Sequence, residues 1–67
     1  MIDVVINGQD RRIEPPGTVR ALLEAFRLKP EMVIVERNGE IVPRARYESE
    51  PVEARDRLEL VQMTAGG

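Results

Sequence analysis

The sequence predicts an α+β fold in which one helix packs across a mixed sheet of four to five strands. Three observations lead to this fold class. Strand-like apolar patterns occupy residues 1–7, 32–37 and 57–63, a helical pattern occupies 19–26, and Asn-Gly pairs at 7–8 and 38–39 mark hairpin turns. One amphipathic helix cannot bury its apolar face alone, and a sheet is the natural surface to cover it.

The first element is a β-hairpin. Apolar residues stand at every second position on one face of the first strand, namely Ile2, Val4 and Ile6. Asn7-Gly8 follows, and both residues tolerate the positive φ of a type I′ turn. Residues 9–14 form the return strand, which Pro15-Pro16-Gly17 ends.

The second element is the helix. Thr18 is the expected N-cap, because its hydroxyl can accept a hydrogen bond from a free amide of the first turn. Apolar residues then follow at i, i+3, i+4 and i+7, the spacing of one helical face: Val19, Leu22, Leu23 and Phe26. Pro30 is expected to stop this helix.

The second half of the chain supplies the remaining strands. Residues 32–37 and 40–42 form a hairpin around Asn38-Gly39, residues 44–56 form an irregular crossover with room for one helical turn, and 57–63 form the last strand. This order is that of a β-grasp, in which the first and last strands lie side by side at the centre of the sheet. We therefore expect one β-grasp domain over 1–63 and a flexible diglycine tail over 64–67 that leaves from the middle of the sheet.

The composition excludes several functions. The chain has 67 residues and a net charge of −2, with no cysteine and no histidine. It therefore lacks thiolate metal ligands and the side chain best suited to proton transfer near neutral pH, which disfavours a metal site and a stand-alone enzyme. The acidic balance argues against nucleic-acid binding. No membrane span or signal peptide is recognisable, so we expect a cytoplasmic protein.

The sequence ends in Gly66-Gly67, and a free diglycine carboxylate is a chemical handle. Neither residue has a Cβ, so this terminus can thread a narrow channel into the active site of another protein. There ATP could activate the carboxylate as an acyl-adenylate for transfer to a nucleophile. Gly67 is then the reacting residue and Gly66 its neighbour, while Thr64 and Ala65 belong to the arm that the partner binds.

A second site follows from strand parity. If Leu58 and Leu60 point toward the helix, the residues that alternate with them point away from it. Four apolar side chains then share the outer face of the sheet, and we predict that they form a patch for docking a partner: Val5, Ile34, Val61 and Met63.

Several of these segments resemble those of a known family. The segment 35–44, which reads Val-Glu-Arg-Asn-Gly-Glu-Ile-Val-Pro-Arg, is similar to the central hairpin of the ThiS family, the sulfur carriers of thiamin biosynthesis. The Asn7-Gly8 hairpin, the helix after Thr18 and the terminal Ala-Gly-Gly at 65–67 extend the resemblance over essentially the whole chain. It implies a ubiquitin-like β-grasp fold.

The resemblance also implies a reaction sequence. An adenylyltransferase of the ubiquitin-activating type uses ATP and Mg²⁺ to adenylate the last glycine, which is Gly67 here. A sulfur donor enzyme then supplies the sulfur of a thiocarboxylate, and thiazole synthase consumes that sulfur. The chain is accordingly expected to be a protein co-substrate with no bound cofactor, rather than an enzyme.

Three alternatives stay open at this point. The first is a sulfur carrier for molybdopterin synthesis, as in the related MoaD proteins, although those chains are usually longer. The second is a ubiquitin-like modifier whose tail is joined to lysines of other proteins. The third is an interaction module in which Gly66 and Gly67 do not react.

Overall fold

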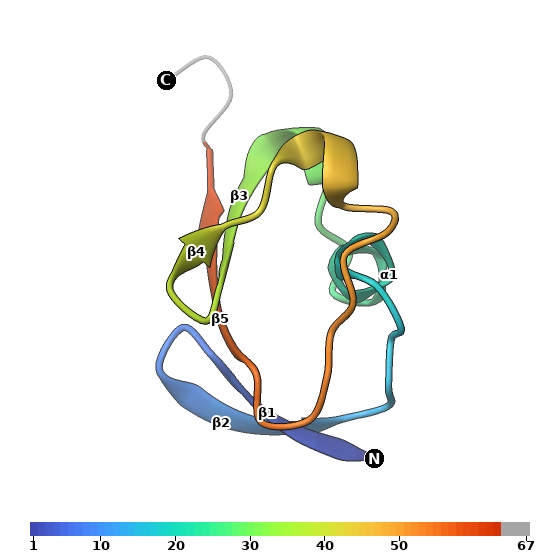
Figure 1. Ribbon diagram of the computed structural model, residues 1–67, viewed down its shortest axis with the longest axis vertical. Coiled ribbons are helices and arrows are strands. Elements are labelled where there is room, and N and C mark those ends of the chain that lie inside the picture. Colours follow the sequence, from blue (N-terminus) through green and yellow to red (C-terminus); the bar gives the residue numbers. More distant parts are fainter. Residues whose placement is uncertain (64–67) are drawn as a thin grey trace.

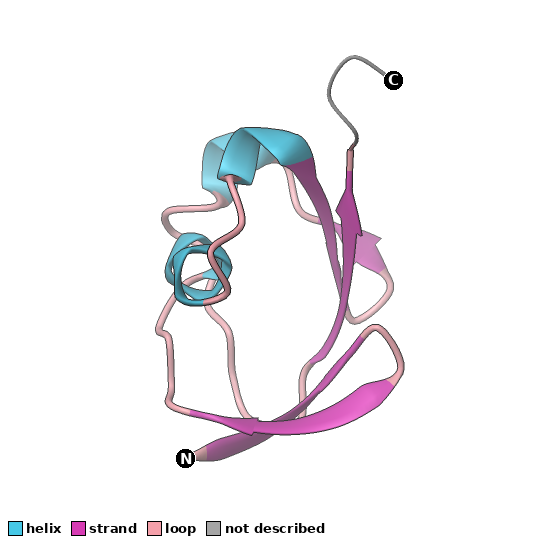
Figure 2. Ribbon diagram, turned by 180° about the vertical axis from the view of Figure 1, so that it is seen from behind, coloured by secondary structure: helices cyan, strands magenta, loops and turns pink. Residues whose placement is uncertain are grey.

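Five strands form one mixed sheet in the order β2-β1-β5-β3-β4, and one α-helix covers one of its faces. The computed structural model describes residues 1–63. The strands are β1 (Ile2–Ile6), β2 (Gln9–Ile13), β3 (Val33–Arg37), β4 (Glu40–Ile41) and β5 (Arg57–Gln62), and the helix is α1 (Val19–Ala25). Single 3₁₀ turns lie at Pro30–Met32 (η1) and Arg44–Arg46 (η2). Figure 1 shows β3 and β5 running side by side, and Figure 2 shows the helical segments on one side of the sheet.

The central position of the last strand is confirmed. β1 and β2 form an antiparallel hairpin, while β1 and β5 run parallel with Ile6 opposite Leu58. On its other flank β5 is antiparallel to β3, with Val35 opposite Leu60. The two Asn-Gly turns adopt the positive φ that the sequence predicted, with φ of 50° at Asn7 and 54° at Asn38. The first hairpin, the second hairpin and the parallel first and last strands therefore match the predicted β-grasp.

The helix begins as predicted and ends earlier. The Thr18 hydroxyl accepts a hydrogen bond from the Ala21 amide at 3.2 Å, so Thr18 is the N-cap. Pro30 does not stop the helix, contrary to the prediction. The helix ends at Ala25 because Arg27 turns into the left-handed region (φ 60°), and the amide of Leu28 bonds the carbonyl of Leu23 at 2.8 Å. This pattern is a Schellman motif, in which arginine occupies the position usually taken by glycine.

The core lies between α1 and the inner face of the sheet. The predicted inner residues are buried or partly buried, and Phe26 of the helical face is partly buried at the helix end. Three further core residues, Val42, Tyr47 and Val52, come from segments whose burial the sequence pattern did not predict. The buried apolar residues are Val4, Ile6, Val19, Leu22, Leu23, Val33, Val35, Val42, Tyr47, Val52 and Leu58.

The crossover 44–56 is fixed to the rest of the fold by backbone hydrogen bonds. The amides of Val19 and Arg20, which are free at a helix start, bond the carbonyls of Glu50 and Tyr47 at 2.9 and 2.8 Å. At its far end the Arg55 amide bonds the Asp3 carbonyl at 2.6 Å. The predicted single turn of helix is the 3₁₀ turn η2. The crossover therefore closes the open side of the core and returns the chain to the sheet centre.

Candidate functional site

The predicted reacting end of the chain lies outside the described residues. This applies to Thr64, Ala65, Gly66 and Gly67, whose predicted roles stay predictions. The structure does define how the chain approaches them. Met63, the last described residue, stands four positions before Gly67.

Strand β5 carries the chain toward this end from the centre of the sheet. Val61 lies opposite Ile34 on β3, and the amide of Met63 donates to the carbonyl of Met32 at 2.7 Å. Pairing with the β3 side therefore continues through residue 63. Because β5 is flanked by β1 at its start and by β3 along its length, the direction of the chain at Met63 is set by the sheet.

Three of the four predicted docking residues gather on the outer face of the sheet. Val61 is 55% exposed, and Ile34 and Met63 are each 38% exposed. Ile34 and Val61 are directly opposed across β3 and β5, a spacing at which side chains touch. Ile41, which the sequence reading did not assign to this face, lies opposite Glu36 on the neighbouring pair of strands and is 66% exposed. We call Ile34, Ile41, Val61 and Met63 the outer apolar patch.

Val5 does not join this patch. It lies opposite Arg57, at the start of β5, whereas Val61 stands four residues further along the same strand. At about 3.3 Å per residue the two positions are roughly 13 Å apart. Strand parity placed Val5 on the correct face, but it could not supply the register between β1 and β5.

An acidic pair borders the outer apolar patch. Glu36 and Glu59 are directly opposite each other on β3 and β5, two residue pairs from Ile34 and Val61 along the ladder and on the same face of the sheet. Like charges in this arrangement repel each other. The outer face therefore combines exposed apolar groups with negative charge, a combination that suits a partner surface with apolar and basic groups.

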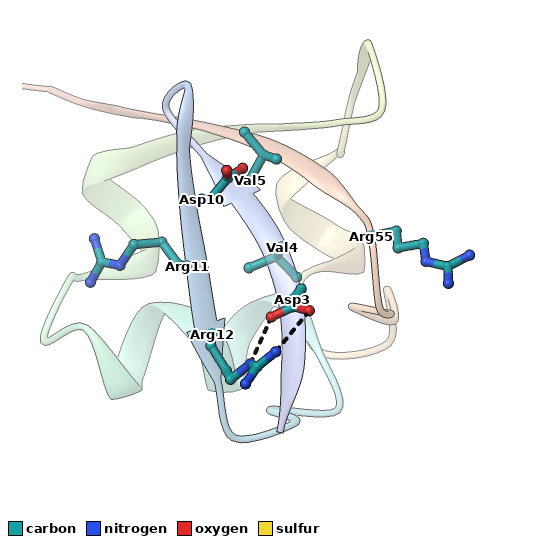
Figure 3. Close-up of a pocket in the computed structure, with 7 residues that line it drawn as sticks. All are labelled: Asp3, Val4, Val5, Asp10, Arg11, Arg12 and Arg55. Carbon is teal, nitrogen blue, oxygen red and sulfur yellow. Dashed lines mark hydrogen bonds and ion pairs between the residues drawn. The ribbon is translucent and has the colours of Figure 1, made fainter.

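A separate shallow depression of about 560 Å³ lies over the first hairpin. Its side chains do not converge on a common point (Figure 3). The Arg12 guanidinium is paired with the Asp3 carboxylate at 2.9 Å, and Arg11 and Arg55 point away from this pair. The Arg12 hydrogen bond and charge lower the pKa of Asp3, so both members stay charged near neutral pH. Nothing in this depression arranges groups for catalysis.

Two features are absent from residues 1–63. This part of the chain contains no helix long and apolar enough to cross a membrane. It also contains no group of three or more acidic, histidine or cysteine residues placed to hold a metal ion. The carboxylates that do cluster, at Glu50, Glu53 and Asp56, surround the guanidinium of Arg37.

The sheet order, the single helix across it and the parallel first and last strands define a ubiquitin-like β-grasp protein. Its last strand, β5, is central in the sheet, and Gly66 and Gly67 follow the end of that strand by four and five positions in the sequence. The chain belongs to the ThiS family, whose model matches residues 4–67.

Three relatives illustrate the family. The sulfur carrier protein ThiS of Bacillus subtilis (strain 168) is 38% identical over 63 residues, which cover 92% of this chain and 96% of that protein. Thiazole synthase of Paramagnetospirillum magneticum is 42% identical over 64 residues, and thiazole synthase of Magnetococcus marinus is 34% identical over 62 residues. This chain spans only 20% and 19% of those two longer proteins.

Solved structures agree with the family. A crystal structure of the thiamine biosynthesis protein (ThiS) from Geobacter metallireducens superimposes with a TM-score of 0.83 at 28% identity. The match covers 98% of this chain and 100% of that one. A solution NMR structure of a thiamine biosynthesis protein from the same organism gives a TM-score of 0.81, again over 98% of this chain. The predicted ThiS resemblance and β-grasp fold are therefore confirmed.

Proposed function

We propose that this chain is a cytoplasmic sulfur carrier protein of thiamin biosynthesis and that Gly67 carries the sulfur as a thiocarboxylate. The observation that carries the proposal is the match of nearly the whole chain to a protein named as a sulfur carrier, together with a terminal Gly66-Gly67. The β-grasp supports it, since the central strand β5 leads to that terminus.

The proposed chemistry has two steps. A carboxylate oxygen of Gly67 attacks the α-phosphorus of ATP, and pyrophosphate leaves, so that an acyl-adenylate forms. Hydrosulfide delivered by a donor enzyme then attacks the acyl carbon and displaces AMP, and loss of the sulfur-bound proton leaves the thiocarboxylate. Adenylation is needed because a carboxylate oxygen is a poor leaving group.

The partner enzymes supply the catalytic groups. The chain contains no histidine and no cysteine, so it offers neither an imidazole base nor a thiol of its own. In this proposal a ubiquitin-activating-type adenylyltransferase binds the ATP and Mg²⁺. The carrier contributes a terminus without side chains, because Gly66 and Gly67 can enter a channel that a Cβ would block.

Thiazole synthase is the proposed acceptor of the sulfur. Two proteins with that name contain a segment of about one fifth of their length that is similar to this chain. A carrier-like segment within the same polypeptide raises the effective concentration of its terminus at the enzyme. That arrangement favours thiazole synthase as a partner of the present chain.

The outer apolar patch is the proposed docking surface for these partners. Val61 lies near the C-terminal end of β5, Met63 directly follows that strand, and Ile34 on β3 is opposite Val61. Four residues past Met63 span at most about 13 Å when extended. A partner that binds the patch would therefore have its reactive centre within about that distance of residue 63.

Intact-protein mass spectrometry tests the proposal. The chain is incubated with ATP, Mg²⁺, a candidate adenylyltransferase and a sulfide source. A mass shift equal to the replacement of one oxygen by sulfur, absent from a chain that lacks Gly67, is the expected result. The product is then offered separately to thiazole synthase and to molybdopterin synthase, and sulfur loss to thiazole synthase alone identifies the pathway. Failure to form an adenylate or a thiocarboxylate with any activating enzyme would overturn the carrier function.

A further inference from the structure

Both Asn-Gly turns use their asparagine side chain to hold strand β5. The Oδ1 of Asn7 accepts a hydrogen bond from the Leu60 amide at 2.8 Å, and its Nδ2 donates to the Leu60 carbonyl at 3.2 Å. On the opposite flank, the Oδ1 of Asn38 accepts from the Arg57 amide at 2.9 Å. Asn38 therefore binds the start of β5 from the β3 side, and Asn7 binds β5 near its end from the β1 side.

The turn conformation alone does not require these contacts. An asparagine at φ of 50° satisfies the turn, and glycine would satisfy it as well. Leu60, the partner of the Asn7 side-chain amide, lies 53 residues away in the sequence. The side chain therefore has a second structural role, which an Asn-Gly pattern does not reveal.

The Asn7 side chain extends the hydrogen bonding between β1 and β5 past the point where the backbone of β1 leaves the sheet. β1 runs parallel to β5, and the Asn7 amide bonds the Leu58 carbonyl at 2.9 Å. The chain then turns back into β2, so no further backbone of β1 is available for Leu60. The primary amide of Asn7 presents an acceptor and a donor with the spacing of a peptide group and takes that place.

The side-chain amide of Asn7 makes the last hydrogen bonds to β5 on the β1 side of the sheet. In the part of the chain that the structure describes, no strand lies beside β5 on the β1 side beyond Leu60. Only the β3 side holds the chain from there to Met63, through the pairs Ile34–Val61 and Met32–Met63. Without the side-chain amide of Asn7, the end of β5 would have no hydrogen-bonded neighbour on the β1 side, just before the reacting terminus.

We propose that Asn7 is a positioning residue for the reaction at Gly67, an inference that rests on the proposed carrier function. Its amide keeps the end of β5 in the orientation that delivers the terminus to the activating enzyme. Without these bonds, only a fraction of the molecules present that orientation at any time. The apparent affinity for the enzyme then falls in proportion to that fraction. The rate of adenylation at saturation stays the same, because the bound complex is unchanged.

The test uses Asn7→Gly in the full chain, with Asn38→Gly as the matched control. Both variants keep an allowed turn conformation, and both lose side-chain bonds to β5. Asn38→Gly acts at Arg57, at the far end of the strand from the terminus, and also loses the bond to Asp56. It therefore lowers global stability at least as much as Asn7→Gly does.

Two measurements are made on each variant. In Asn7→Gly, hydrogen exchange at the Leu60 amide is expected to accelerate by about three- to tenfold, the factor that a lost hydrogen bond of ordinary strength produces. The KM of the carrier in ATP–pyrophosphate exchange should rise by a similar factor, roughly three- to tenfold, with kcat unchanged. Asn38→Gly should leave both the KM and the Leu60 exchange close to those of the unchanged chain.

Each contrary outcome is distinguishable. Unchanged hydrogen exchange at the Leu60 amide in Asn7→Gly would show that the Asn7 side chain does not hold the end of β5. An equal rise in KM for both variants would show that Asn7 acts only through overall stability, and an unchanged KM would overturn its role in delivery. If the unchanged chain supports no adenylation at all, the proposed function fails and this role fails with it.

Discussion

The guanidinium of Arg37 and the carboxylate of Asp56 form the most buried ion pair within residues 1–63, with Nε and Oδ2 2.7 Å apart. The side chains are 17% and 7% exposed, respectively. Arg37 ends β3 and Asp56 ends the crossover, so the pair joins the second hairpin to the start of β5. Glu50 and Glu53 complete the surroundings of the guanidinium, at 3.2 and 3.0 Å.

The charge of Asp56 is stabilised despite its burial. Burial acts to raise the pKa of Asp56, but the hydrogen bonds from Arg37, the Glu53 amide and Asn38 outweigh it, and the pKa lies below its usual value. A carboxylate with a lowered pKa in the folded state stabilises the fold above its unfolded pKa, which is about 3.9. This stability is lost as the pH falls from there through the folded pKa.

The first prediction concerns acid unfolding. The free energy of unfolding should fall below about pH 5 in the unchanged chain, because unfolded aspartates begin to bind protons there. Asp56→Asn should cost about 2–3 kcal/mol at pH 7 and flatten the acid limb of the curve, since it leaves part of the Arg37 charge unpaired. Urea unfolding monitored by circular dichroism between pH 2 and pH 7 measures both effects.

Asp3→Asn is the control for this prediction. Asp3 also has a lowered pKa, through its hydrogen bond with Arg12, but that pair is exposed to solvent. Exposed pairs contribute little, so Asp3→Asn should leave the stability at pH 7 nearly unchanged. Equal losses for the two variants would contradict the structural importance assigned to the Arg37–Asp56 pair.

The second prediction concerns Tyr47, which is 4% exposed and whose hydroxyl donates to the Val33 carbonyl at 2.7 Å. β4 pairs with β3 only at Glu36 and Arg37, so the hydroxyl replaces a missing strand at Val33. Tyr47→Phe keeps the ring and leaves a buried carbonyl without this donor, which should cost about 1–2 kcal/mol. The urea midpoint should fall with an unchanged m-value. A neutral effect would show that water or another donor replaces the hydroxyl.

Tyr47 also marks a limit of sequence-based prediction for this fold. The strands and α1 were predictable because apolar residues repeat at the period of each element. The crossover has no such period, so the burial of Tyr47 and Val52 emerges only from the tertiary structure, and the strand predicted over 40–42 was too short to place Val42 in the core. The end of α1 was missed for a related reason, since a Schellman turn at Arg27 lacks the glycine that usually signals it.

The candidate site was predictable in part. The diglycine handle is a property of the sequence itself, and strand parity placed Ile34, Val61 and Met63 on the outer face. Parity could not show that Val5 lies opposite Arg57, because the register of β1 against β5 depends on the path of the whole intervening chain, 7–56. Nor could it show that Ile41 belongs to the same face, since β4 is only two residues long.

The third prediction concerns Gly39 in the second hairpin turn. Its φ is +87°, and a Cβ built there would meet no atom within 4 Å. Gly39→Ala should therefore cost about 1–2 kcal/mol through backbone conformation alone. A chemically synthesised chain with D-alanine at this position accommodates positive φ and should be at least as stable as the unchanged chain. Equal destabilisation by both alanines, measured by thermal unfolding, would point to side-chain crowding instead.

The fourth prediction tests the outer apolar patch through two valines that lie on the same face of the sheet. Val61→Ser removes an exposed member of the patch beside Ile34, whereas Val5→Ser acts beside Arg57, roughly 13 Å away along β5. If the patch docks the activating enzyme, Val61→Ser should raise the KM of the carrier in ATP–pyrophosphate exchange by about fivefold or more, which corresponds to about 1 kcal/mol of binding energy. Val5→Ser should leave the KM unchanged, although Val5 is the more buried residue and its loss should cost more stability. Because the stability and KM effects are expected to run in opposite order, a KM that follows stability in both variants would place the docking surface elsewhere.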